Sequence, residues 1–259
     1  MNESVLVSRD GAIATVTLSN PEKLNALGLD SWKRLGEVMR ELDADKTLRC
    51  IVIRGAGEKA FAAGADIAEF ETTRKNAKVA KKYGEALEAT MGALSACRHP
   101  IVAMIHGACV GGGLEVASQC DLRICGTSSR FGIPINKLGL VVGYGEMKAL
   151  IDLVGRAVAL EILLEGRVFG AEEAKDKGLV NRVVPDDKVE EESMAAARRI
   201  AEGAPLVARW HKKFARRLAQ ARPLTRTERD EAYACFDTED FKTGVKAFLA
   251  KQKPQFKGK

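Results

Sequence analysis

Two glycine-bearing segments of the chain carry backbone amides in positions suited to holding an anion. Residues 61–67 (FAAGADI) follow a compact apolar run, and residues 106–115 (HGACVGGGLE) follow another. Each segment lies where a strand is expected to lead into a helix, and the first amides of a helix have no intrahelical acceptor. Glycine also lets a ligand approach the backbone closely. One amide from each segment can therefore converge on a single oxygen and stabilise negative charge there.

Glu115 is the carboxylate best placed to move a proton beside such an anion. It follows the last glycine of the second segment by two residues and falls in the first turn of the expected helix. The positive end of that helix lowers the pKa of the carboxyl group, whereas burial raises it. An acid at a helix start is common, and it is the flanking glycines that make Glu115 the leading catalytic candidate.

Spacing argues against several other chemistries. No Lys-Ser or Lys-Thr follows the glycines at 107–113, as a phosphate loop requires, and the G-x-G-x-x-G spacing of a dinucleotide site is missing. The six cysteines are scattered without a C-x-x-C pair, and three histidines do not provide metal-site spacing. We expect reduced, mostly buried cysteines in a cytoplasmic protein.

The order of expected elements predicts an α/β core followed by helices. Two alternating runs around Asp10-Gly11 predict a hairpin, and strands and helices alternate after it. The expected strands are 4–8, 12–18, 48–54, 101–105, 121–125 and 179–184, and the expected helices are 30–45, 75–96, 114–119, 146–165, 171–177 and most of the chain from 189 onward. A ββα unit is expected to recur at 12–45, 48–96 and 101–119. We predict a catalytic core over residues 1–195 and a helical subdomain over residues 196–259.

Composition is that of a globular protein with an aliphatic core. The hydrophobic fraction is 46% and the aromatic fraction 5%, which favours layers of sheet and helix. The longest apolar stretch, 101–117, is interrupted by His106 and Glu115 and is too short to span a bilayer. The first ten residues lack the basic start and apolar run of a secretory signal. We therefore expect a cytoplasmic protein without a membrane segment.

The net charge of +6 is concentrated in residues 198–217. Such a basic stretch can attract a phosphate-bearing ligand or a nucleic acid. The pattern favours the plainer interpretation of a solvated helix face. The basic residues are Arg198, Arg199, Arg209, Lys212, Lys213, Arg216 and Arg217.

The two glycine segments, in this order, resemble the signatures of the enoyl-CoA hydratase/isomerase (crotonase) superfamily. Residues 61–67 are similar to its first signature, and residues 106–121 (HGACVGGGLEVASQCD) to its second. Residues 21–27 (PEKLNAL) look like the family's N-x-A-L loop, and residues 248–258 (FLAKQKPQFKG) like its closing segment. The resemblance covers nearly the whole chain. It implies an α/β, crotonase-like fold of repeated ββα units with a helical C-terminal subdomain.

The resemblance also implies roles for individual residues. It puts the oxyanion donors at the amides of Ala65 and Gly112, with a thioester carbonyl between them and Glu115 as the first family glutamate. Coenzyme A is expected as part of an acyl-CoA substrate, with no permanently bound cofactor and no metal. Homotrimers or homohexamers are implied, with Lys253 and Phe256 as candidates for reaching a neighbour's site. The residues implied to line the substrate and coenzyme A side are Lys23, Leu24, Ala26, Ala63, Asp66, Ile67, Gly111, Ile135 and Gly143.

The second family glutamate is missing from this chain. The family's F-G-x-P-E segment reads FGIPIN at residues 131–136, so Ile135 stands in the place of the glutamate. Isoleucine can neither donate nor accept a proton. Hydration requires activating water at one carbon and protonating the next, which the family usually divides between two carboxylates. Here the usual second carboxylate is missing, and the alternative is that one carboxylate serves both steps in a syn addition.

Four nearby residues were weighed as replacements. Asn136 can orient a water but cannot act as a base, and Tyr144 is expected to pack or line the acyl pocket. Glu146 is expected to head the next helix as an acid that complements the helix dipole. His106 is expected to be a structural hydrogen-bonding residue at a strand end. The sequence leaves open whether any of them replaces the glutamate.

The predicted function is that of an enoyl-CoA hydratase, a lyase of fatty acid metabolism that adds water reversibly to 2-enoyl-CoA. The missing glutamate keeps open a double-bond isomerase, which needs a single base, and a malonyl-type acyl-CoA decarboxylase, which Pro134-Ile135-Asn136 loosely resembles. A member that binds acyl-CoA without turning it over is a further alternative. All of these use the same enolate-stabilising site or part of it.

An RNA-binding function is disfavoured. One branch of the superfamily binds AU-rich RNA through a basic helix early in the chain. The corresponding residues here, 30–45, contain more acidic than basic side chains. A nucleic-acid complex depends on cationic contacts with phosphates, so no nucleic-acid partner is expected.

Overall fold

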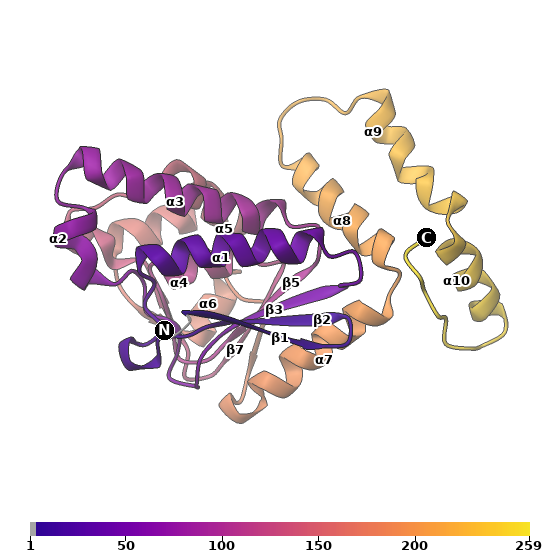
Figure 1. Ribbon diagram of the computed structural model, residues 1–259, viewed down its shortest axis with the longest axis horizontal. Helices are drawn as coiled ribbons and strands as arrows, with labels where there is room; N and C mark the ends of the chain where they lie inside the picture. Colours follow the sequence, from indigo (N-terminus) through magenta and orange to yellow (C-terminus); the bar gives the residue numbers. More distant parts are fainter. Residues whose placement is uncertain (1–3) are drawn as a thin grey trace.

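The larger of two sheets has six strands in the computed structural model, which describes residues 4–259 (Figure 1). β1 and β2 form the predicted antiparallel hairpin, in which Gly11 adopts a φ of 56°, and the remaining neighbours pair in parallel. Parallel strands with helical crossovers place their carboxyl ends at one edge of a sheet. In spatial order the strands are β1 (Val5–Asp10), β2 (Ile13–Leu18), β3 (Cys50–Gly55), β5 (Ile101–Ile105), β7 (Leu122–Gly126) and β10 (Arg182–Val184).

A second, smaller sheet was not predicted from the sequence. Its strands have two or three residues each, which is too short to produce an alternating pattern. β4, β6 and β8 follow β3, β5 and β7 along the chain, so successive strand pairs divide between the two sheets. This is the repeated ββα organisation expected above, and the α/β fold class is confirmed. The strands are β4 (Ala60–Ala62), β6 (Ala108–Val110), β8 (Arg130–Gly132) and β9 (Phe169–Gly170).

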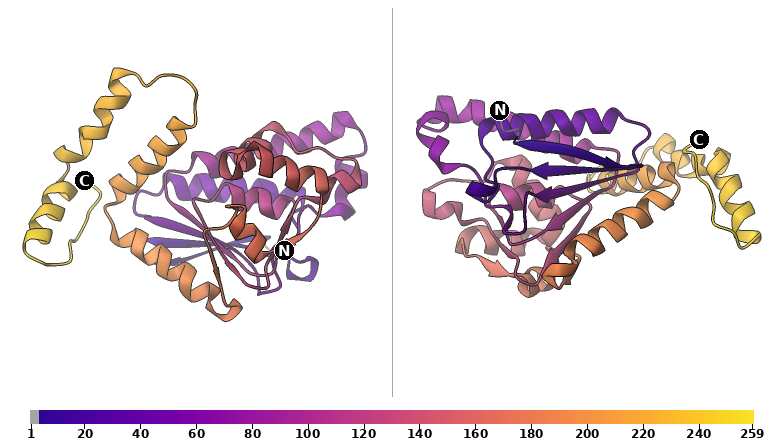
Figure 2. Two further views of the ribbon diagram at one scale, coloured as in Figure 1. Left: turned by 180° about the vertical axis from the view of Figure 1, so that it is seen from behind. Right: turned by 60° about the horizontal axis from the view of Figure 1, so that its bottom comes forward.

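Helices cover both faces of the larger sheet (Figures 1 and 2). α1 (Leu29–Ala44) and α3 (Ala77–Ala96) lie on one face and contribute to the main apolar core. α7 (Val189–Glu202) lies on the other and buries its small apolar side chains against β3 and β5. The other core helices are α2 (Phe70–Thr73), α4 (Gly112–Ser118), α5 (Tyr144–Glu165), α6 (Ala171–Asp176) and four 3-10 helices at Pro21–Lys23, Ile67–Glu69, Pro134–Leu138 and Asp186–Lys188.

The C-terminal helices extend from one side of the core (Figures 1 and 2). The predicted boundary at residue 195 falls inside α7, which packs on the sheet, and the extension begins after Glu202. Within residues 4–259, no helix is long and apolar enough to cross a membrane. The helices of the extension are α8 (Pro205–Leu218), α9 (Arg226–Asp230), a 3-10 helix (Glu231–Asp237) and α10 (Glu239–Leu249).

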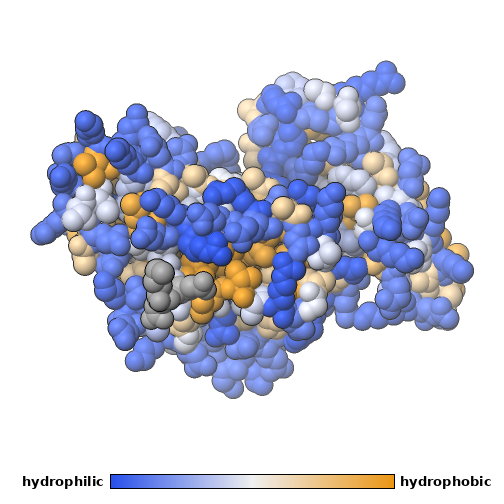
Figure 3. Space-filling view, in the orientation of Figure 1, coloured by the Kyte–Doolittle hydropathy of each residue, from blue (hydrophilic) through white to orange (hydrophobic). Residues whose placement is uncertain are grey.

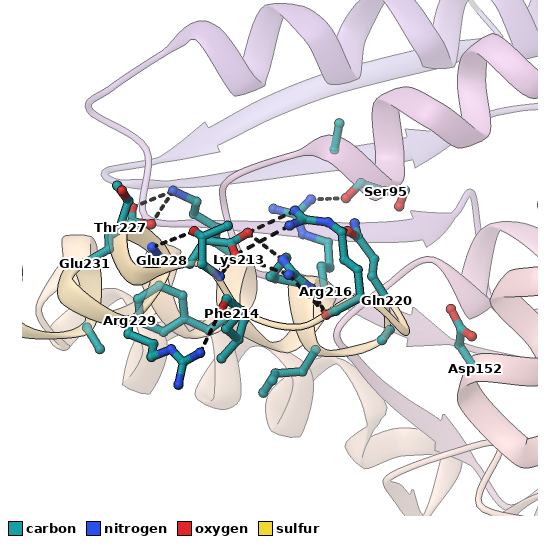
Figure 4. A pocket seen from close by; sticks show the side chains of 18 of the residues that line it. Ser95, Asp152, Lys213, Phe214, Arg216, Gln220, Thr227, Glu228, Arg229 and Glu231 are labelled. Atoms are coloured by element: carbon teal, nitrogen blue, oxygen red, sulfur yellow. Dashed lines mark hydrogen bonds and ion pairs between the residues drawn. The ribbon is translucent and has the colours of Figure 1, made fainter.

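Basic side chains of α8 attach that helix to the core and to α9, so the interpretation as a solvated face is wrong for them. Arg209 donates to the carbonyl of Leu48 at 3.1 Å, and Lys212 Nζ donates to the carbonyl of His99 at 2.8 Å. Arg217 pairs with Glu228 in the wall of a cleft of about 1270 Å3 between α8 and α9 (Figure 4). These cations are therefore already used in holding the tail in place.

The visible face is mostly hydrophilic and the cysteines are free and mostly buried, as the composition and the cysteine spacing predict. Most of the face seen in Figure 3 is hydrophilic, with apolar side chains gathered over the sheet below α1. All six cysteines lie in the described part of the chain and are free, and every one except Cys235 is buried. Burial raises the pKa of the Cys109 thiol well above its usual value, which keeps it protonated and unreactive.

Candidate active site

The two glycine-bearing segments lie against each other at the start of α4. A Cβ placed on Gly111 would lie 3.5 Å from Gly64 Cα, and one on Gly112 would lie 3.7 Å from the Gly64 carbonyl carbon. Gly111 adopts a φ of 52° and a ψ of −123°, a conformation that side-chain-bearing residues rarely take. Glycine at this turn thus permits both the chain reversal and the close approach of the two backbones.

The amides of Ala65 and Gly112 are free to bind a ligand. Leu27 N–H donates to the Gly64 carbonyl at 2.8 Å, and Asp66 N–H donates to the Leu27 carbonyl at 3.1 Å, which fixes the residues on either side of Ala65. Gly112 is the first residue of α4, so its N–H has no intrahelical acceptor. Within residues 4–259 neither amide donates a hydrogen bond to another backbone carbonyl.

These amides open into a cavity of about 150 Å3 between α1, α4 and the start of α5. Eight residues named from the sequence line it, from both glycine segments and from the segment that follows β8. They are Ala63, Ala65, Ile67, Gly111, Gly112, Glu115, Ile135 and Gly143. The structure therefore brings together residues that are far apart in the chain.

Four other residues named from the sequence lie outside this lining, in the neighbouring loop. Lys23 Nζ pairs with Asp66 at 2.7 Å, and Ala63 N–H donates to the Leu24 carbonyl at 3.0 Å. Ala26 belongs to the same loop and accepts a hydrogen bond from Asn20 Nδ2 at 3.3 Å. This loop thus borders the segment that carries the Ala65 amide.

Glu115 lies in the cavity with a strongly perturbed acidity. Burial, together with the negative charge of Glu146, raises the pKa of Glu115 to about 7, and the positive charge of Arg74 acts in the opposite direction. A carboxyl group with this pKa is present both as acid and as base near neutral pH. Its position and acidity suit the proton-handling role predicted for it.

Glu146 heads α5, as expected of an acid that complements the helix dipole, but its surroundings add to that interpretation. It lies in the first turn of α5, is buried and lines the same cavity as Glu115. Its distance from Glu115 along the chain concealed this pairing. The helix-start position gives the same sequence signal whether the side chain faces water or a cavity.

The other residues weighed as replacements do not face this cavity. Tyr144 is 96% exposed and lies outside the lining, so the expectation that it packs or lines the pocket is wrong. Asn136 Nδ2 donates to the Leu164 carbonyl at 2.9 Å. His106 is buried outside the lining, and burial lowers its pKa.

Sequence reasoning also missed Trp32 and Arg74. Trp32 lines the cavity, and a Cβ on Gly112 would lie 2.8 Å from its ring. The Arg74 guanidinium lies 4.3 Å from the centre of the Phe70 ring and 4.2 Å from that of Tyr83. Trp32 falls in the helix predicted at residues 30–45, but no sequence pattern distinguishes it from the other buried residues of that helix. Arg74 lies in a segment without periodicity.

Among residues 4–259, no group of three or more His, Cys, Asp or Glu side chains is arranged to hold a metal ion. The larger cleft beside α8 is also chemically different from the cavity at Glu115. Its charged side chains pair with one another, as Figure 4 shows for Lys213 with Glu231.

The two sheets of repeated ββα units match the fold of the crotonase superfamily. A sequence profile described as Enoyl-CoA hydratase/isomerase matches residues 8–259, and the chain belongs to this family. The predicted recognition of the family is confirmed.

Individual relatives match along almost the whole chain. A probable enoyl-CoA hydratase of Mycobacterium tuberculosis is 37% identical over 257 residues, with 98% of each chain covered. A short-chain-enoyl-CoA hydratase of Clostridium acetobutylicum is 34% identical over 252 residues, with 96% of each covered. The crystal structure of an enoyl-CoA hydratase/carnithine racemase from Magnetospirillum magneticum is 47% identical, with a TM-score of 0.98 over 100% of this chain and 97% of that one.

Proposed function

We propose that this protein is an enoyl-CoA hydratase, which adds water reversibly across the 2,3 double bond of an enoyl-CoA thioester. The observation that carries the proposal is the position of Glu115, in one cavity with the free amides of Ala65 and Gly112. Relatives named enoyl-CoA hydratase or crotonyl-CoA hydratase at 32–37% identity support this reaction over isomerisation or decarboxylation. A place in fatty acid metabolism follows from the same substrate class.

In this proposal the thioester oxygen accepts hydrogen bonds from the Ala65 and Gly112 amides. Addition of water at C3 places negative charge on that oxygen as the enolate forms. The two donors stabilise the charged enolate oxygen more than they stabilise the neutral carbonyl oxygen of the substrate. Donors of this kind are each worth roughly a hundred- to a thousandfold in rate. Glu115, whose pKa of about 7 lets it hold or release a proton, exchanges the proton at C2.

Coenzyme A enters as part of the substrate, and the loop at residues 23–26 would hold it. Lys23 is exposed beside Asp66, where its ammonium group is available to a phosphate of the coenzyme. Leu24 and Ile67 are exposed apolar side chains at the same edge of the cavity. These residues would bind the ligand without taking part in the chemistry.

The test is a panel of CoA thioesters (2-enoyl, 3-enoyl and malonyl-type) incubated with the purified protein and followed by mass spectrometry. We expect a gain of one water on crotonyl-CoA, and no loss of carbon dioxide from malonyl-type thioesters. Glu115→Gln should lower the hydration rate by roughly a hundred- to ten-thousandfold, the usual contribution of a general acid or base. Glu88→Gln, at an exposed position of α3, is the matched control. Wild-type activity in the Glu115→Gln variant, or no gain of water by any 2-enoyl-CoA, would contradict the proposal.

We further propose a cytoplasmic homotrimer, which can pair into a homohexamer. Support comes from apolar side chains exposed on the C-terminal extension, since contiguous exposed apolar surface often marks an interface. Lys253 Nζ contacts Glu202 at 2.6 Å, and the Phe256 carbonyl accepts from Arg49, so both residues have partners within their own chain. Light scattering coupled to size-exclusion chromatography should give three or six times the mass of one chain. The exposed apolar residues are Tyr233, Phe236, Phe241, Val245, Phe248 and Leu249.

A further inference from the structure

Two carboxylates from different helices share the cavity. Glu115 projects from the first turn of α4 and Glu146 from the first turn of α5, and both line the same space. Ile135, which stands where the family's second glutamate is expected, lines it as well. The cavity therefore contains a second carboxylate even though the family position for it is apolar.

We propose that Glu146 is the second catalytic acid–base residue of hydration in this chain, supplied by α5 in place of the carboxylate that Ile135 lacks. The inference rests on the proposed hydratase function and deepens it. It assigns to Glu146 the activation of the attacking water and leaves to Glu115 the proton at C2.

A purely structural role for Glu146 is poorly supported by its contacts. Glu146 is the third residue of α5, after the N-cap Gly143, where a glutamate can accept from the N-cap amide. No such bond is formed, and within residues 4–259 the Glu146 carboxylate has neither a hydrogen-bond donor nor an ion-pair partner. Its oxygens keep accessible surface in the cavity, where they can contact a water or a ligand.

The backbone at Gly143 leaves room for this carboxylate. A Cβ placed on Gly143 would lie 2.6 Å from Glu146 Oε2, closer than any side-chain carbon can approach. The absence of a side chain at residue 143 therefore permits the Glu146 head group to fold back over the start of the helix. Gly143 was expected to contact substrate, and it also shapes the position of Glu146.

Three charged side chains determine how the cavity holds protons: Glu115 from α4, Glu146 from α5 and Arg74 from the segment between α2 and α3. The negative charge of Glu146 raises the pKa of Glu115, and the positive charge of Arg74 lowers it. Two carboxyl groups of one cavity interact through their charges, so a change at residue 146 should alter the acidity of Glu115.

The proposed step balances as follows. The oxygen of water forms a bond to C3 while one of its protons moves to the Glu146 carboxylate. The π electrons of the C2–C3 bond pass into the thioester to give the enolate, held by the Ala65 and Gly112 amides. The enolate then collapses as C2 takes the proton from Glu115. A proton returns from Glu146 to Glu115 through solvent, and the net change is the addition of H and OH.

The test compares two reactions in Glu146→Gln, Glu115→Gln and the control Asp152→Asn, an exposed acid further along α5. The first reaction is hydration of crotonyl-CoA. The second is exchange of the C2 proton of butyryl-CoA in deuterated water, a gain of one mass unit that needs a single base and no attacking water. We expect Glu146→Gln to lose roughly a hundred- to ten-thousandfold in the kcat of hydration and to keep exchange within tenfold. Glu115→Gln should lose both reactions, and Asp152→Asn neither.

The pH dependence of exchange gives a readout that a structural role would not change. Exchange needs ionised Glu115, so its rate should rise with pH through the pKa of Glu115, about 7 in the wild-type protein. Neutral glutamine at residue 146 removes the negative charge that raises this pKa. The rise should therefore move to lower pH in Glu146→Gln. Asp152→Asn should leave it unchanged.

Several outcomes would overturn the assignment. Hydration by Glu146→Gln within threefold of wild type would do so, as would an equal loss of hydration and exchange in a variant with the wild-type melting temperature. If Glu146→Gln does not fold, Glu146→Asp keeps the charge on a shorter side chain. The Glu146→Asp variant must then lose more of the hydration rate than of the exchange rate. If it does not, the assignment is wrong. A wild-type protein that exchanges the C2 proton but hydrates no 2-enoyl-CoA would instead refute the hydratase function.

Discussion

The indole Nε1 of Trp32 donates a 2.7 Å hydrogen bond to the hydroxyl of Tyr83, and this buried contact joins α1 to α3 beside the cavity. The Trp32 ring in turn contacts the backbone at Gly112, where a Cβ would lie 2.8 Å from it. Trp32, which Tyr83 orients, therefore packs against the backbone of Gly112, whose amide is proposed to hold the thioester oxygen. Four predictions follow from this arrangement and from the charges around it.

Tyr83→Phe should remove the acceptor and leave the Trp32 N–H buried without a partner. An unsatisfied buried donor costs about 1–3 kcal/mol, so we expect urea denaturation to show a loss of this size in the free energy of unfolding. The kcat of hydration should fall further than KM changes, because the Gly112 amide is proposed to act on the transition state. Unchanged stability in Tyr83→Phe would show that the hydrogen bond contributes nothing.

Glu115→Gln should make the protein more stable at pH 8 but not at pH 4. Because the pKa of Glu115 rises from 4.5 to about 7 on folding, the neutral acid is favoured in the folded state. Below pH 4.5 the group is neutral in both states and costs nothing. Between pH 4.5 and 7 it ionises first in the unfolded state and stability is lost.

The full penalty above pH 7 is roughly 3 kcal/mol, at about 1.4 kcal/mol for each unit of pKa. Glutamine does not ionise and escapes this penalty. Urea denaturation at both pH values, with Glu88→Gln as control, measures the difference. An equal stability difference at pH 4 and pH 8 would contradict the elevated pKa of Glu115.

Arg74→Met should move the pH dependence of C2-proton exchange in the direction opposite to Glu146→Gln. The positive charge of Arg74 lowers the pKa of Glu115, so its removal should raise that pKa and shift the rise in exchange rate to higher pH. Loss of the guanidinium contacts with Phe70 and Tyr83 should also cost roughly 0.5–2 kcal/mol of stability. Arg156→Met, at an exposed position of α5, is the control. A shift to lower pH would show that Arg74 does not act on Glu115 through its charge.

Asn25→Ala should destabilise the loop that borders the Ala65 amide. Asn25 is buried at a φ of 57°, and its side chain donates to the carbonyls of Ala56 at 3.1 Å and Ala60 at 2.8 Å. Its Oδ1 also accepts from the Asn20 N–H at 3.0 Å. Alanine would lose all three bonds and adopt this φ at a cost, which together should lower the free energy of unfolding by roughly 2–4 kcal/mol.

Asn25→Gly separates the two causes, because it removes the hydrogen bonds but tolerates the positive φ. It should lie between Asn25→Ala and the wild-type protein in thermal unfolding. If both variants unfold within a degree of wild type, the loop does not depend on Asn25.

Local sequence was sufficient to predict the longer helices and strands and the turn that joins the glycines at 111–113 to Glu115. α1, α3 and α7 each carry an apolar stripe with helical spacing, and the hairpin is marked by Asp10-Gly11. The glycines and Glu115 are neighbours in the chain, so a single turn of α4 sets their relation. These features depend on interactions between residues a few positions apart, and such interactions produce recognisable patterns in the sequence.

Only the tertiary structure decided which side chains meet Glu115. The short strands of the second sheet carry no periodic signal, yet they bring the Ala65 amide to the start of α4. Glu146 has the same local sequence signal at a helix start whether it faces water or Glu115, and it is the packing of α5 over α4 that buries it. The pKa of Glu115 depends on that burial and on charges from two distant segments. The sequence by itself determined the family and one candidate catalytic carboxylate, Glu115, whereas the place of the second carboxylate, Glu146, depends on long-range packing.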